Sequence, residues 1–312
     1  MTTTLLWIIF AVIVIGVMAL DLGIFDRHAH VVSTKEAAMW TGVWVSLALL
    51  FNLGIYFFMG QNAALEFLTG YLIEYSLSVD NIFVFIMLFS YFAVEPQYRH
   101  RVLFWGIIGA LVFRGLLIGV GSALISRFHW ILYLFGAFLL FTAAKMALQK
   151  QDDEPDPEKN PVVNLFKQYF PVTEKFHGEH FFTRLPNGKL VATPLFITLL
   201  VIETTDIMFA LDSIPAIFAV TQNSFIVFTS NVFAIMGLRS LYFLLDGIMG
   251  LFRYLKYGLS VILGFIGAKM LISSFVEIPT ALSLGVVIGV LAISILASVL
   301  IPDRQASPTQ HD

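Results

Sequence analysis

Residues 194–219 read PLFITLLVIETTDIMFALDSIPAIFA, an apolar run that carries three acidic residues, Glu203, Asp206 and Asp212. A bilayer core of about 30 Å is spanned by a helix of about 20 apolar residues. An ionised side chain at the bilayer centre costs at least about 2.5 kcal/mol, and such residues usually mark a pathway or a partner. This stretch therefore predicts a bundle of membrane helices with its chemistry at membrane depth.

The composition of the whole chain agrees with a membrane protein. Of the 312 residues, 58% are hydrophobic and 12% are charged, and the mean hydropathy is +0.86. Soluble domains average about 45–50% apolar and about 25% charged residues. These values argue against a soluble enzyme, and the net charge of −3 offers no basic surface for a nucleic acid. The chain has no cysteine, which removes disulfides, thiolate metal ligands and cysteine nucleophiles.

Nine stretches are long and apolar enough to span a bilayer, which predicts an all-α polytopic membrane protein with nine transmembrane helices. They are residues 5–25, 39–59, 65–92, 102–124, 129–148, 194–219, 225–247, 257–275 and 280–301. Lys and Arg gather on the cytoplasmic side of membrane proteins. If the N-terminus is outside, thirteen of the eighteen Lys and Arg fall in inside segments and only Arg127 falls outside. We therefore expect an N-terminus outside and a cytoplasmic C-terminus.

The predicted spans divide the chain into two membrane parts. Residues 1–148 hold the first five spans, residues 193–301 hold the other four, and residues 149–192 between them are predicted to form a cytoplasmic loop. In that loop, Asn187-Gly188 lies between two short apolar runs, which is typical of a small β-hairpin. Residues 302–312 are predicted to be a polar, disordered tail.

The two membrane parts contain the same three elements in the same order. The elements of the first part and their counterparts are Glu74 and Asp80 with Asp206 and Asp212, Arg114 with Arg239, and Lys145 with Lys269. Each copy covers three spans, at about residues 65–148 and 193–275. Because three is odd, the two copies must be inserted in opposite directions. Inverted repeats of this kind are typical of secondary transporters, whose binding sites lie near the bilayer midplane.

Acidic residues outnumber basic ones in the predicted spans. Five of the acidic residues lie in the third and sixth spans, and they are Glu74, Asp80, Glu203, Asp206 and Asp212. The two spans run antiparallel, so we expect these five side chains to lie at similar depth around one central cavity. Even if the four basic residues of the spans are all paired, the cluster stays acidic once Asp246 is counted. Surplus buried carboxylates need a cation or protons.

Helix geometry separates the acidic residues of the sixth span. Glu203 and Asp206 are three residues apart and share a helix face, whereas Asp212 lies about 180° around a regular helix from Glu203. Pro215 is expected to kink the helix and so turn Asp212 toward the face that carries Glu203 and Asp206. The proline also leaves the carbonyl of Leu211 without its donor. A freed carbonyl beside a carboxylate is a suitable ligand for a hard cation.

The side chains at these positions offer oxygen atoms. In the third span, Glu74, Ser78 and Asn81 lie on one helix face with Asp80 beside it. Oxygen-only ligation favours the hard ions Mg²⁺, Ca²⁺ and Mn²⁺. The expected metal ligands are Glu74, Asp80, Asn81, Glu203, Asp206 and Asp212, and the expected auxiliary residues are Ser78, Leu211, Ser213, Arg114 and Arg239. We expect the two arginines to be structural counter-ions.

Four strings in the chain are long enough to compare with known families. They are EYSLSVDNIFV at 74–84, ETTDIMFALDSIPA at 203–216, FLTGYLIE at 67–74 and TSNVFAIMGLR at 229–239. Together they resemble the TerC family of integral membrane proteins, most closely its alkaline-induced Alx branch. The resemblance covers about residues 5–301 and implies a manganese exporter of the bacterial inner membrane. It also implies the fold of the LysE-like exporters, which have inverted three-helix repeats. In the family, Glu74, Asp80, Glu203, Asp206 and Asp212 take the positions of the acidic transport residues.

Export of Mn²⁺ is the preferred hypothesis. The ion would enter from the cytoplasm, bind the carboxylates and leave outward as one repeat moves against the other. Protons are a candidate counter-ion, because crowded carboxylates favour protonation. Ligand type alone does not separate Mn²⁺ from Ca²⁺ or Mg²⁺. The expected partners are the lipid bilayer, the metal ion and protons, and we expect no enzymatic activity.

Two other classes of function remain open. The chain could be a membrane partner in metal loading or tellurite resistance that transports nothing itself, with residues 149–192 contacting another protein. An intramembrane aspartyl protease also carries two Asp on different spans. However, neither Asp80 nor Asp212 lies in a Gly-x-Gly-Asp context, and a catalytic dyad needs two carboxylates rather than five.

Overall fold

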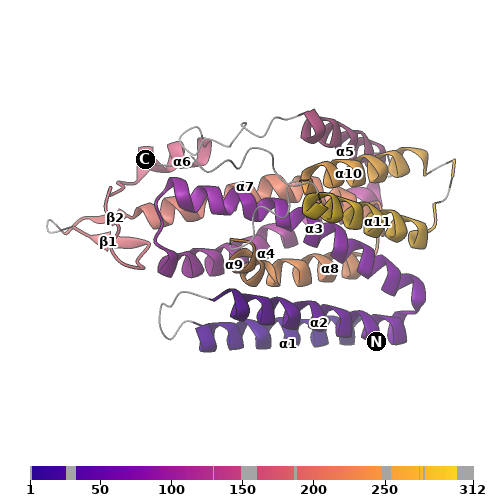
Figure 1. Cartoon of the computed structure of the whole chain (residues 1–312), viewed down its shortest axis with the longest axis horizontal. Coiled ribbons are helices and arrows are strands. Elements are labelled where there is room, and N and C mark those ends of the chain that lie inside the picture. Colours follow the sequence, from indigo (N-terminus) through magenta and orange to yellow (C-terminus); the bar gives the residue numbers. More distant parts are fainter. Residues whose placement is uncertain are drawn as a thin grey trace.

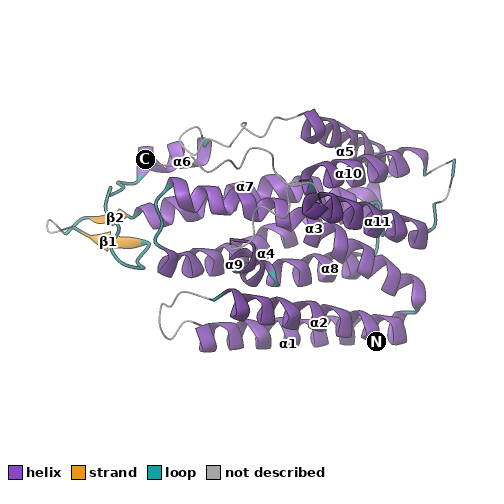
Figure 2. Ribbon diagram, in the orientation of Figure 1, coloured by secondary structure: helices purple, strands orange, loops and turns teal. Residues whose placement is uncertain are grey.

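The computed structural model of this chain describes residues 2–25, 33–128, 130–148, 160–185, 188–246, 254–273, 275–276 and 278–300. Helices make up most of these ranges, and two short strands form a hairpin (Figure 2). In chain order the elements are α1 (Thr2–Phe25), α2 (Thr34–Met59), α3 (Gln61–Tyr91), α4 (Pro96–Arg127), α5 (Ile131–Leu148), α6 (Pro161–Tyr169), β1 (Phe182–Arg184), β2 (Leu190–Ala192), α7 (Pro194–Phe218), α8 (Ser224–Met236), α9 (Leu238–Asp246), α10 (Leu255–Ile272) and α11 (Thr280–Leu300).

Seven helical segments in the described ranges are long and apolar enough to cross a membrane. They are α2, α3, α4, α5, α7, α11 and the combined segment Ser224–Asp246, which contains α8 and α9. Two shorter apolar helices, Thr4–Met18 in α1 and Tyr257–Ile272 in α10, coincide with the remaining predicted spans. The long helices lie side by side along one axis (Figure 1). The all-α polytopic fold is therefore confirmed, while the number of nine spans stays a prediction.

The predicted seventh span, 225–247, consists of two helices. α8 ends at Met236 and α9 begins at Leu238, with Gly237 between them. Hydropathy does not reveal such a break, and a single glycine inside a helix costs only about 1 kcal/mol relative to alanine. The break places Arg239 in the first turn of α9, where its side chain is buried.

The connection between α5 and α7 contains helix α6, which packs along the first half of α7 (Figure 1). The side chain of Asn160 caps α6 and also donates a hydrogen bond from Nδ2 to Oγ1 of Thr204, at 2.8 Å. Farther along α6, the ring of Phe166 lies 5.2 Å from that of Phe196. This part of the predicted loop is therefore attached to α7 rather than separate from the bundle.

Strands β1 and β2 form the hairpin that the sequence predicts after α6. They pair antiparallel, with Phe182 opposite Ala192. Residues 186–187 of the turn, and the predicted tail 302–312, lie outside the described residues. Gly188 follows with a φ of 79°, a left-handed backbone conformation that glycine adopts readily.

Helices α3, α4, α7 and α8 form the centre of the bundle. α3 packs against both α7 and α8, and α4 also packs against both of them. Most of α3 and of the α8–α9 segment is buried inside the protein, whereas most of α2 faces outward. Aromatic rings attach the N-terminal pair of helices, since Trp7 of α1 contacts Phe225 of α8 and Phe51 of α2 contacts Phe233 of α8. Side chains on the inner faces of α3, α4, α7 and α8 therefore point into the same interior of the bundle.

Helices α5 and α10 approach each other closely through small residues. A Cβ atom at Gly136 would lie 3.0 Å from the carbonyl oxygen of Gly267, and a Cβ at Gly267 would lie 2.9 Å from that of Gly136. Farther along the pair, Oγ of Ser260 donates to the carbonyl of Ala143 at 2.9 Å. Small residues allow such close backbone contact between membrane helices.

Replacing Gly136 by leucine is expected to lower the free energy of unfolding by about 1–3 kcal/mol, the usual cost of overpacking. The added side chain meets backbone atoms of α10, which cannot rotate away. Thermal denaturation of the purified protein in detergent measures the change. Gly119→Leu on α4 is the matched control, because nothing lies within 4 Å of a Cβ at Gly119. Equal stability of the two variants would contradict the close contact.

Candidate ion site in the membrane helices

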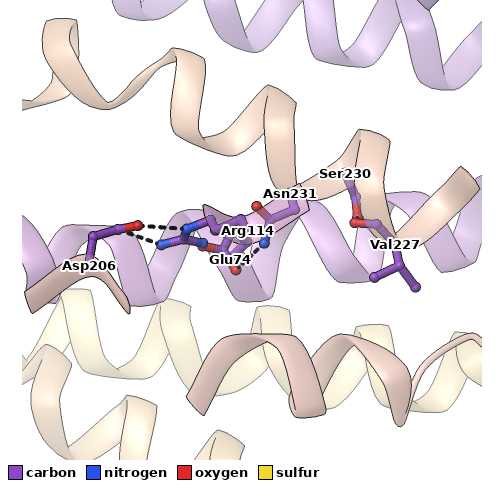
Figure 3. Close-up of polar contacts among 6 residues, drawn as sticks. All are labelled: Glu74, Arg114, Asp206, Val227, Ser230 and Asn231. Carbon is purple, nitrogen blue, oxygen red and sulfur yellow. Dashed lines mark hydrogen bonds and ion pairs between the residues drawn. The ribbon is translucent and has the colours of Figure 1, made fainter. Parts of the chain in front are cut away.

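Arg114 of α4 is the centre of a polar network that joins four helices (Figure 3). Its Nε and Nη2 atoms donate to the two carboxylate oxygens of Asp206 in α7, at 3.1 and 2.8 Å. Its Nη1 atom pairs with Oε1 of Glu74 in α3. Asn231 in α8 donates from Nδ2 to Oε2 of the same glutamate, at 3.0 Å. All four carboxylate oxygens of Glu74 and Asp206 therefore accept a hydrogen bond.

This network is closed to solvent. The exposed fractions of Glu74, Arg114 and Asp206 are 0%, 1% and 3%. Buried charges are tolerated when they are paired and hydrogen-bonded, and removal of one partner is costly. Two carboxylates share one guanidinium here, so these three side chains together carry one formal negative charge.

Glu203 lies one helix turn before Asp206 on α7 and has a different environment. A Cβ atom at Gly109 of α4 would overlap the carboxylate of Glu203, so the glutamate fits against α4 only because residue 109 has no side chain. The Oε2 atom of Glu203 is buried and has no hydrogen-bond partner among the described residues. A buried carboxylate oxygen without a donor favours binding of a proton or a cation.

Asp212 contacts a different helix from Asp206. Its Oδ1 atom accepts a hydrogen bond from Oγ1 of Thr142 in α5, at 3.0 Å. Lys145, one turn along α5, interacts with Asp212 electrostatically. Asp212 therefore lies on the side of α7 that faces α5, and Asp206 lies on the side that faces α4.

The expectation that Pro215 redirects Asp212 toward Glu203 and Asp206 is wrong for this structure. α7 runs unbroken through Pro215 to Phe218. The proline removes one backbone donor, but the helical period continues, and nine residues still correspond to about 180°. The side chain of Leu211 is 48% exposed. The role of its backbone carbonyl as a cation ligand stays a prediction.

The other predicted site residues lie in the bundle interior where they are described. Ser78, Asn81, Ser213 and Arg239 are buried. The hydroxyl oxygens of Ser78 and Ser213 have no hydrogen-bond partner in the described ranges. The side chain of Asp80 lies outside the described residues. Within the part of the chain that the structure describes, no three acidic or histidine side chains come close enough to hold a metal ion, and the five-carboxylate site stays a prediction.

Three residues that the sequence did not single out contact the predicted ones. Asn231 binds Glu74, Thr142 binds Asp212, and Gly109 makes room for Glu203. A signal for Asn231 was present, since Thr229-Ser230-Asn231 is a polar triplet inside an apolar span. Thr142 and Gly109 carry no such signal, because single threonines and glycines are common in membrane helices.

A second ion pair joins α4 and α9 near one end of the bundle. Nη1 of Arg99 lies 3.3 Å from Oδ2 of Asp246 and donates to the hydroxyl of Tyr242, at 3.1 Å. The side chains of Arg99 and Asp246 are 17% and 37% exposed. Asp246, whose role the sequence left open, is therefore part of a partly exposed pair away from the Arg114 network.

Comparison with known proteins places these helices in a family. The sequence model of the integral membrane protein TerC family matches residues 59–306, a range that contains every predicted site residue. The chain is 52% identical over 307 residues to the uncharacterized membrane protein STKORF319 of Myxococcus xanthus, which covers 98% of this chain and 95% of that protein. It is also 52% identical over 303 residues to a protein of Escherichia coli K12 named as a candidate membrane-bound redox modulator, Alx, with 94% of each chain covered. No solved structure matches the chain.

Proposed function

This chain belongs to the TerC family of integral membrane proteins, and from that premise we propose that it exports divalent metal cations, with Mn²⁺ as the preferred cargo. Oxygen ligands suit Mn²⁺, Ca²⁺ and Mg²⁺ alike. The choice of Mn²⁺ among them follows the TerC resemblance. In this proposal the protein lies in the bacterial inner membrane with its N-terminus outside, and transport needs no catalytic residue.

The charge around Arg114 carries the proposal. Glu74, Asp206 and Glu203 supply three carboxylates, and Arg114 supplies one positive charge. These four side chains therefore carry two formal negative charges, which one divalent cation would balance. Glu203 lies about 14 Å along α7 from Pro194, well inside a bilayer core of about 30 Å. A charge deficit at that depth favours a cation or protons as the missing partner.

We further propose that two inverted three-helix repeats, α3–α5 and α7–α10, alternate the access to this site. The packing of the helices supports this: α3 packs on α8 just as its counterpart α7 packs on α4. In the sequence register of the repeat, the contact of Gly136 with Gly267 corresponds to the contact of Ser260 with Ala143. A two-fold relation between the copies would produce exchanged contacts of this kind.

Flux of Mn²⁺ through the purified protein tests the proposal directly. Protein in liposomes that contain a Mn²⁺-sensitive dye is expected to carry the ion. Asp80→Ala and Asp212→Ala are each expected to reduce the flux at least about tenfold, as the loss of about 1.4 kcal/mol of ion binding would. Cells carrying either variant should retain Mn as a null strain does.

Asp246→Asn is the control for that experiment, because it removes a carboxylate that pairs with Arg99 at the edge of the bundle. Its flux should match that of the unchanged protein. Unaltered efflux in both Asp80→Ala and Asp212→Ala would end the proposal of a carboxylate pathway. Protons are the proposed counter-ion, and an outward Mn²⁺ gradient should then drive protons in the opposite direction.

The name of the Alx relatives favours a second candidate, a role in redox balance. These 312 residues include no cysteine, so a thiol of this chain cannot supply such a role. A redox effect would then follow from the metal content of the cell or from a partner protein. Absence of Mn²⁺ flux in liposomes, together with an altered redox state in cells that lack the chain, would favour this candidate over export.

A further inference from the structure

We infer that Arg114 is an internal cation that occupies the carboxylates of Glu74 and Asp206 and must be displaced before a metal ion binds them. The inference rests on the proposed function and adds a regulatory device to the same site. Under this arrangement the arginine and the cargo compete for one set of oxygen atoms.

The geometry of the network leads to this inference (Figure 3). The guanidinium donates to both oxygens of Asp206, at 3.1 and 2.8 Å, and to Oε1 of Glu74. The remaining oxygen, Oε2 of Glu74, holds the amide of Asn231. A metal ion would need oxygens from these two carboxylates, and every one of them already accepts a hydrogen bond.

Electrostatics makes the two cations exclusive. A divalent ion bound to the same carboxylates would lie only a few ångströms from the guanidinium, and like charges repel strongly where water is excluded. Arg114 is almost wholly buried, so its charge cannot be screened by solvent in place. Binding of the metal therefore requires the guanidinium to move away from at least one carboxylate.

The same exchange would serve the return step of a transporter. When no cargo is bound, the guanidinium keeps two of the carboxylates paired at membrane depth, where a bare charge is costly. The empty site can then reorient without carrying the cargo back. Glu203, whose Oε2 atom has no donor among the described side chains, offers an arriving metal a first contact that Arg114 does not block.

Substitution of Arg114 by lysine tests the competition through the sign of an affinity change. Lysine keeps the positive charge but lacks the planar fork that binds a carboxylate through two nitrogens, so it competes less well. The apparent Kd of Mn²⁺ is expected to fall about tenfold, equivalent to about 1.4 kcal/mol. An arginine that merely braces the helices predicts the opposite sign or no change. Titration of the purified protein with Mn²⁺ alone measures the Kd.

Arg99→Lys is the matched control, because Arg99 also joins α4 to an aspartate, at the edge of the bundle. Its Kd for Mn²⁺ should equal that of the unchanged protein. If Arg114→Lys does not fold, Arg114→Ala purified with methylguanidinium replaces it. Methylguanidinium should then weaken Mn²⁺ binding to Arg114→Ala in proportion to its concentration, and should leave binding to the unchanged protein as it was.

The possible failures are distinguishable. A folded, unchanged protein that neither binds nor carries Mn²⁺ would overturn the proposed function, and the inference with it. An unchanged protein that carries Mn²⁺, together with an Arg114→Lys variant that binds the ion no more tightly, would overturn the inference alone. Methylguanidinium that strengthens Mn²⁺ binding to Arg114→Ala would do the same.

Discussion

Replacing Arg114 by methionine is expected to lower the free energy of unfolding by about 3–5 kcal/mol, the range measured when one partner of a buried ion pair is removed. Methionine has a similar length and fills most of the same space, so the loss is electrostatic rather than a cavity effect. Without the guanidinium, Glu74 and Asp206 would be two buried carboxylates with no positively charged partner. Thermal denaturation in detergent, monitored by circular dichroism, measures the loss.

Arg99→Met provides the comparison. Arg99 and Asp246 form a partly exposed pair, and pairs of that kind contribute only about 0–1 kcal/mol. The informative quantity is therefore the loss in free energy of unfolding for Arg114→Met relative to that for Arg99→Met. Mn²⁺ should also raise the melting temperature of Arg114→Met, because a ligand that binds only the folded state stabilises it. Equal losses at Arg99 and Arg114 would show that burial of the central pair contributes nothing.

The membrane helices could be predicted because their signal is strong and local. A run such as 194–219 is apolar over the length that a bilayer requires, even though it contains three acidic residues. The break at Gly237 could not be predicted, because it depends on how α8 and α9 pack against α2, α3 and α4. The packing of α6 on α7 could not be predicted for a similar reason, because the hydrogen bond from Asn160 to Thr204 joins residues far apart in sequence.

The candidate site was predicted only where its residues are charged. Glu74, Asp206 and Arg114 stand out in apolar spans, and the structure brings these three together. Sequence spacing within one helix separated Asp212 from Glu203 by about 180°, but Pro215 was wrongly expected to cancel that separation. It could not reveal which neighbouring helix each side chain meets, because that depends on the rotation of every helix in the bundle. For the same reason Thr142 and Asn231, which are neutral, became visible only as partners.

Substitution of Glu203 should change Mn²⁺ flux without lowering the stability of the protein. Glu203→Gln keeps the size of the side chain and its fit against Gly109 but removes its charge. In liposomes, Mn²⁺ flux is expected to fall at least about tenfold, equivalent to the loss of about 1.4 kcal/mol of ion binding. The stability of the protein should stay the same or rise, because a buried carboxylate oxygen without a donor is unfavourable. Flux and thermal denaturation on one preparation measure both effects.

Glu95→Gln is the control, since Glu95 is an exposed glutamate at the start of α4 and should change neither flux nor stability. Reduced flux together with unchanged or raised stability in Glu203→Gln would distinguish an ion ligand from a structural carboxylate. A structural Glu203 would lose stability and flux together, because its removal would disturb the packing of α7 on α4. Full flux with raised stability would mean that the unpaired oxygen holds a proton rather than cargo, and the ion pathway would then have to avoid this face of α7.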